Sequence, residues 1–177
     1  DGTNISFITT GLEGNAMIAA KDEKGKTVWS WHIWITDIPD DLRYENDLGI
    51  FDVQDRNLGA TRADRGLGEQ WKESTGLDFQ WGRKDPFAGK HLLETNQYYW
   101  IADFILHPDV WANDWERTES MWKTDMKTIY DPCPVGYRVA VPDVWTGLST
   151  TGENVDRTEN MNIAGAFDYG WSFYINE

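Results

Sequence analysis

Tryptophan is the feature that most limits how this chain can fold. The chain has 177 residues, eleven of them tryptophan, and aromatic residues make up 14% of it. A chain of this length forms one domain by default, and each indole takes up a large share of the core. We therefore expect a single domain over residues 1–177 that leaves some indoles at the surface. The tryptophans are residues 29, 31, 34, 71, 81, 100, 111, 115, 122, 145 and 171.

Charge and hydropathy limit the partners of the chain. The formal net charge is −14, whereas nucleic-acid binding depends on Lys and Arg that neutralise phosphates. No stretch approaches the roughly 18 consecutive apolar residues that a membrane helix needs. We expect no nucleic-acid partner and no direct membrane insertion. Residues 1–13 do not have the features of a signal peptide, so we expect them to end a preceding segment, with any export signal further upstream.

The clearest local structure is a β-hairpin over residues 16–36. Residues 16–22 and 27–36 are rich in strand-forming residues, and Gly25 lies in the short turn between them. Side chains alternate between the two faces of a strand. One face of the second strand is therefore apolar and predicts a core face, while the other is mixed. The apolar face carries Trp29, Trp31, Ile33 and Ile35, and the mixed face carries Val28, Ser30, His32, Trp34 and Thr36.

The rest of the chain predicts an α+β domain with small antiparallel sheets, few short helices and much irregular surface. We expect strands at residues 50–54 and 77–81, and a loop between them at 59–76. Apolar residues near helical spacing predict a short helix at 97–106, which Pro108 would end. Two polar stretches, 107–129 and 142–164, predict long loops, and long loops in compact domains are usually functional.

Catalytic and zinc sites have little support in the sequence. His32, His91 and His107 have no neighbouring pattern typical of a nucleophile and its base. The only cysteine, Cys133, cannot form a disulfide within the chain and, with three scattered histidines, does not supply a zinc site. We therefore expect a protein that is not an enzyme and that has no cofactor.

Calcium is the metal ion with the best candidate ligands, because it prefers several oxygen atoms. The metal ligands nevertheless stay unknown, since solvated loop carboxylates are the simpler interpretation of both candidate groups. The groups are Asp37, Asp40 and Asp41, and Asn113, Asp114 and Glu116.

Tryptophans in polar loop sequence are the best candidates for ligand contact. An exposed indole can stack on the apolar face of a sugar or anchor a protein contact. The alternative is that such rings fix long loops to the core. We expect the contact region where rings and oxygen atoms concentrate in one non-periodic stretch. Its residues are Trp111, Asn113, Asp114, Trp115 and Trp122.

Four ordered segments together resemble a known family. They are residues 14–35, 55–60, 79–87 and 128–142, with sequences such as DRNLGA, FQWGRKDPF and IYDPCPVGYRV. They are similar to the Fibrobacter succinogenes major paralogous (FISUMP) domain of Bacteroidetes surface lipoproteins and fimbria-associated proteins, over roughly residues 14–175. Several ionic residues lie in these segments, and we expect them to fix turns more readily than to bind ligand. They are Arg56, Arg83, Lys84 and Asp85.

The resemblance implies a C-type-lectin-like fold and a role in adhesion or ligand binding at the cell surface. Family members continue past a segment like 167–174 to a terminal Arg-Cys, so the fold would here be truncated, or completed by another chain, and Cys133 would lack its partner. The related sulfatase-modifying enzymes rely on paired reactive cysteines, which this sequence lacks. Lectin-type calcium motifs are also missing, because residues 111–114 are only loosely similar to one of them.

The leading hypothesis is an extracellular adhesion module that is associated with fimbriae or a surface lipoprotein. Its anchor to the outer membrane would lie outside this chain, and its partner would be a glycan or a host or bacterial surface protein. A second hypothesis is an assembly domain whose exposed aromatic residues contact another pilus subunit. A third is a phage receptor-binding protein.

Overall fold

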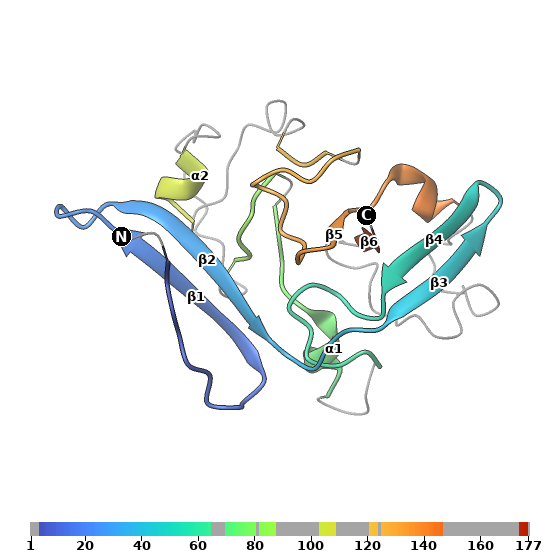
Figure 1. Ribbon diagram of the computed structural model, residues 1–177, viewed down its shortest axis with the longest axis horizontal. Helices are drawn as coiled ribbons and strands as arrows, with labels where there is room; N and C mark the ends of the chain where they lie inside the picture. The colour runs from blue at the N-terminus through green and yellow to red at the C-terminus, as the bar shows by residue number, and fades with distance from the viewer. Residues whose placement is uncertain are drawn as a thin grey trace.

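The computed structural model describes residues 4–64, 70–80, 82–87, 103–108, 121–123, 125–146 and 174–176. These residues form two small antiparallel sheets with little helix, so the mixed class predicted from the sequence is confirmed. The two sheets lie on opposite sides of a central region of irregular chain (Figure 1). No helix among the described residues is long and apolar enough to cross a membrane.

The first sheet is the predicted hairpin. Strand β1 (Gly14–Lys21) pairs antiparallel with β2 (Thr27–Ile35), with Ile18 opposite Trp31. Gly25 has a φ of 78° in the turn, a conformation that favours glycine. The Asp22 carboxylate accepts hydrogen bonds from the amides of Lys24 at 2.9 Å and Lys26 at 2.8 Å. The hairpin and the role of Gly25 are therefore confirmed.

The mixed face of the hairpin contacts the interior, which was not predicted, although Val28 on this face is 50% exposed. Ser30 is buried, and Trp34 packs against the main hydrophobic cluster. Trp29, Trp31, Ile33 and Ile35, on the other face, are only half-buried. The reason is that the polar groups of the mixed face find partners in distant segments of the chain, as described below.

The second sheet has the strand order β3-β4-β6-β5. Strands β3 (Asp41–Asn46) and β4 (Gly49–Gln54) form a hairpin, and β6 (Tyr174–Asn176) joins β4 to β5 (Tyr137–Val139). The predicted strand at 50–54 is therefore confirmed, while β3 and β5 were not predicted. In the turn after β3, the Asn46 side chain accepts hydrogen bonds from the amides of Leu48 and Gly49.

Two sequence predictions around α1 are wrong. Helix α1 (Trp71–Thr75) lies inside the predicted loop 59–76, and residues 77–80 form no strand. The amide of Leu77 donates to the carbonyl oxygen of Leu58 at 2.9 Å, and the carbonyl oxygen of Asp78 accepts from the amide of Phe87 at 2.9 Å. These backbone groups bind loops rather than a neighbouring strand. Gly76 approaches Leu58 so closely that a Cβ would lie 2.5 Å from its carbonyl oxygen.

Helix α2 (Asp103–Leu106) confirms the end of the predicted helix, since Pro108 follows it. The rest of that prediction, residues 97–102, lies outside the described residues. The described parts of the loop predicted at 107–129 contain no helix or strand. The loop predicted at 142–164 begins instead with a 3-10 helix, η2 (Pro142–Trp145).

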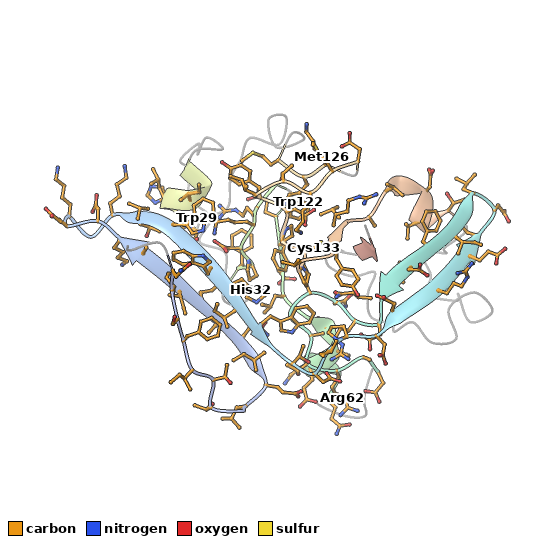
Figure 2. All side chains as sticks on the ribbon, viewed as in Figure 1. Trp29, His32, Arg62, Trp122, Met126 and Cys133 are labelled. Carbon is orange, nitrogen blue, oxygen red and sulfur yellow. The ribbon has the colours of Figure 1, made fainter. Side chains whose placement is uncertain are left out.

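The main hydrophobic cluster lies between the two sheets. Leu58 contributes from the loop after β4, and the segment that leads into β5 contributes most of the others. The buried members are Leu58, Met121, Trp122, Cys133 and Val139, and the half-buried residues packed on them are Trp34, Phe79, Tyr130 and Tyr137. Figure 2 shows Trp122 and Cys133 in this central position. Burial raises the pKa of the Cys133 thiol far above its ordinary range, so this cysteine behaves as a small apolar residue.

Candidate binding surface on the first hairpin

The predicted contact region is only partly within the described residues. Trp111, Asn113, Asp114 and Trp115 lie outside them. Trp122 is described, and it is 4% exposed. Its indole Nε1–H donates to the carbonyl oxygens of Arg83 at 3.0 Å and Tyr130 at 2.9 Å. The expectation that Trp122 contacts a ligand is therefore wrong. Its ring fixes a loop to the core, which was the other possibility considered for tryptophans in loops.

The first predicted calcium group does not converge on one point. Asp37 pairs with Arg56, and Asp41 accepts a hydrogen bond from the Tyr137 hydroxyl. Asp40 contributes its backbone carbonyl, which accepts from the amide of Asp55 at 3.0 Å. Within the described part of the chain no group of three His, Cys, Asp or Glu side chains could hold a metal ion. The second predicted group, residues 113, 114 and 116, lies outside this part.

The ionic residues of the family-like segments bind other parts of the chain, and the main contacts join distant segments instead of fixing single turns as predicted. The Arg56 guanidinium binds both carboxylate oxygens of Asp55, at 2.7 and 3.0 Å, and also pairs with Asp37. Hydrogen bonds from Arg56 lower the pKa of the Asp37 carboxyl. Because Asp37 follows β2 and Asp55 follows β4, this bidentate geometry joins the ends of the two sheets.

A buried polar cluster of Ser30, Lys84 and Asp85 fastens the inner face of β2. The Lys84 ammonium donates to the Ser30 carbonyl oxygen at 2.6 Å, to Ser30 Oγ at 2.8 Å and to Asp85 Oδ2 at 2.5 Å. The Ser30 hydroxyl donates to the same Asp85 oxygen. Burial lowers the pKa of Lys84, and Asp85 opposes that change. A buried charge pair of this kind requires all of its hydrogen bonds to be satisfied.

A serine beside a lysine also has the composition of a nucleophile and its base. In this cluster, however, Ser30 is 2% exposed and its hydroxyl hydrogen is bound to Asp85. The ammonium of Lys84 is held by a carboxylate, which favours its protonated form. The geometry therefore supports an anchor for the strand rather than attack on a substrate.

His32 lies on the same inner face and is held as a neutral ring. Its Nε2 lies 2.8 Å from Asn15 Oδ1, which can only accept, so Nε2 carries the hydrogen. The Asn15 amide in turn donates to the Gly59 carbonyl oxygen at 2.7 Å. The ring of Phe79 meets the imidazole edge-on, with centroids 6.2 Å apart. Desolvation lowers the pKa of His32 below its ordinary value of 6.5, although the charge of Asp85 opposes the change.

This pKa shift predicts a loss of stability in mild acid. Since the unfolded chain binds a proton at His32 near pH 6.5 and the folded chain binds it only at lower pH, the free energy of unfolding should decrease as the pH falls below 6.5. The slope from this residue is at most about 1.4 kcal/mol per pH unit. Urea unfolding between pH 7.5 and 5 measures it. The variant His32→Gln, which keeps an N–H donor, should remove this decrease, and an unchanged slope would contradict the assignment.

The outer face of the hairpin is the candidate binding surface. Residues directly opposite in an antiparallel pair share a face, so β1 adds Ala16, Ile18 and Ala20 to the apolar residues of β2. We call this the outer face; it consists of Ala16, Ile18, Ala20, Trp29, Trp31, Ile33 and Ile35. It contains no charged or polar side chain, and none of its β2 residues is buried. The Lys84 ammonium lies 4.6 Å from the centre of the Trp29 ring at its margin, a cation–π contact.

Sequence reasoning identified this face by its alternation but assigned it to the core. The signal that the opposite face contacts the interior is the partner of Ser30, because a buried serine requires a polar neighbour. The lysine and the aspartate that bind it lie 54 and 55 residues further along the chain. No known protein family, curated protein or solved structure matches the chain.

Proposed function

We propose that this chain is an extracellular, non-catalytic binding module whose ligand contacts the outer face of the first hairpin. The observation that carries the proposal is the outer face itself, a half-buried apolar surface with two tryptophans at alternate positions of one strand. Apolar faces of this kind suit the flat side of a sugar ring or an apolar protein patch. The buried ionic groups around it are occupied in joining segments of the chain.

The resemblance of residues 14–35, 55–60, 79–87 and 128–142 to FISUMP domains supports the same proposal. Through it we assign the chain a C-type-lectin-like fold and a place on the bacterial cell surface or on fimbriae. The ligand would then be a glycan or a surface protein. The loop with Trp111, Asn113, Asp114 and Trp115 is proposed as a second contact region, independent of the outer face.

Trp31→Ala tests this proposal most directly. Trp31 lies in the middle of β2, where it opposes Ile18 across the sheet. Removing a central aromatic anchor typically costs 2 kcal/mol or more of binding free energy, so we expect a loss of affinity of about thirtyfold. A glycan array and a panel of extracellular matrix proteins, probed with the whole chain, identify the ligand. Calorimetry or surface plasmon resonance then measures the affinity.

Ile50→Ala is the matched control, because Ile50 is a 50% exposed apolar residue of the other sheet. The Ile50→Ala variant should bind the ligand with the same affinity as the wild type. The pair Trp111→Ala and Trp115→Ala tests the second contact region separately. Wild-type affinity in Trp31→Ala, with its folding verified by circular dichroism, would remove the outer face from the proposal, and absence of any ligand in both screens would contradict it entirely.

A further inference from the structure

No strand among the described residues pairs with the outer edge of β1. Lys84 binds the Ser30 carbonyl oxygen, so this group points away from β1. Ser30 opposes Ala19, and hydrogen-bonded and non-hydrogen-bonded pairs alternate along an antiparallel ladder. The backbone N–H and C=O groups of Asn15, Met17 and Ala19 therefore point away from β2, and we call these groups the β1 edge. No hydrogen bond joins the β1 edge to another described residue.

The two edges of this hairpin differ. The edge of β2 is closed at Ser30 by the Lys84 ammonium, and α2 lies beside this strand (Figure 1). Within the described part of the chain, the β1 edge has neither a side chain bound to its carbonyl groups nor a helix beside it. From Gly14 to Ala20 it contains no proline and no charged residue, which are the devices that normally keep an exposed edge strand from pairing. An edge of this kind is a template for another strand.

Charges at the two ends of β1 indicate which strand that is. Glu13 precedes the strand and Lys21 ends it, and both are exposed. The Glu13 carboxylate also accepts a hydrogen bond from the Asp37 amide of its own chain at 3.2 Å. Suppose that a second β1 runs antiparallel to the first, with Met17 opposite Met17. The numbers of paired residues in such a ladder have a constant sum. Asn15 of one copy then lies opposite Ala19 of the other, and Glu13 lies opposite Lys21. Each end then joins opposite charges. No ion pair joins Lys21 to another described residue, so its charge is available for this contact.

We propose that the β1 edge pairs with the β1 edge of a second copy of this chain around a two-fold axis at Met17. The result is a four-stranded sheet with the order β2-β1-β1-β2. About six backbone hydrogen bonds would form between the two copies. Ala16 of one copy would oppose Ile18 of the other, so that the two outer faces become one continuous apolar surface. The proposal does not depend on the proposed ligand.

Charge reversal tests both the partner and the register. Sedimentation velocity of the whole chain at about 5–500 μM and 0.15 M salt should show a monomer–dimer equilibrium. At this salt concentration the Debye length is about 8 Å, so the repulsion between two copies of charge −14 is largely screened while ion pairs in contact persist. Lys21→Glu places like charges at both ends of the interface and should raise the dissociation constant about tenfold. Glu13→Lys should raise it in the same direction, and because this change also removes the acceptor of the Asp37 amide, its folding is verified by circular dichroism.

The double variant Glu13→Lys/Lys21→Glu restores opposite charges in the proposed register, so it should dimerise like the wild type. Lys26→Glu is the matched control, because it makes the same charge change in the exposed turn, outside the paired segment, and it should dimerise normally. A wild-type chain that stays monomeric at 500 μM would overturn the proposal. The proposal would also be overturned if the double variant dimerised as weakly as the single variants. Amide protection of Met17 and Ala19 in a monomer would indicate pairing within one chain instead, and would also overturn it.

Discussion

Replacing Asp131 with alanine is expected to lower the free energy of unfolding by about 3–5 kcal/mol. The Asp131 side chain is 0% exposed. One carboxylate oxygen accepts from the amide of Cys133 at 2.8 Å and from the Lys127 ammonium at 3.1 Å, and the other accepts from the amide of Val139 at 3.0 Å. Alanine would leave two buried amides without an acceptor and an ammonium without its counter-ion. Urea unfolding followed by tryptophan fluorescence measures the change.

The destabilisation should exceed that expected from one lost carboxylate, because the Lys127 ammonium depends on Asp131 for its counter-ion. It also donates to the carbonyl oxygens of Cys133 at 2.7 Å and Tyr137 at 2.8 Å. Asp131 and Lys127 thus hold the loop that carries Cys133 and leads into β5 as one unit. Asp131→Asn, which keeps an acceptor but loses the charge, should fall between the wild type and Asp131→Ala. Asp125→Ala removes an exposed carboxylate nearby and should change stability by less than about 0.5 kcal/mol. Equal effects of the two alanine variants would contradict this role of Asp131.

The first hairpin could be predicted from sequence because every signal for it is local. Alternation in residues 27–35, the turn at Gly25 and the strand-forming residues of 14–21 lie within one short stretch. Its orientation could not be predicted in the same way. From polarity alone, the face with Ser30 and His32 was predicted to be a mixed face and not the core face. The side chains that bind Ser30 and His32 come from other parts of the chain. Burial of a polar residue is decided by its partner, and the partner is not visible in local sequence.

The missed and misassigned elements have a common cause. Strand β3 has the sequence DLRYEN, which is too polar to predict a strand, and it forms because Asn46 builds the turn that brings it onto β4. Residues 77–80 have strand-forming composition, but their backbone groups bind loop carbonyl and amide groups instead of a ladder. In both cases tertiary contacts override local propensity.

The candidate site was only partly accessible to sequence reasoning. The expected surplus of indoles at the surface stays a prediction, since among the tryptophans whose side chains are described Trp29, Trp31 and Trp34 are half-buried and Trp122 is buried. The choice of residues for the surface was less successful, because Trp122 has a polar loop sequence around it yet is buried. The indole N–H explains this difference: a loop can bury Trp122 when two backbone carbonyls accept its hydrogen.

Asp85→Ala is expected to destabilise the chain by about 3 kcal/mol, because it leaves the largely buried Lys84 ammonium without its carboxylate and Ser30 without its acceptor. Lys84→Met should cost a similar amount, since it isolates the Asp85 carboxylate. The double variant Lys84→Met/Asp85→Ala removes both charges, so its cost should be about 2 kcal/mol less than the sum of the two single changes. Urea unfolding of the four proteins measures this coupling. Additive effects would show that the two charges are independent, and would contradict the view that this pair fastens β2 to the interior.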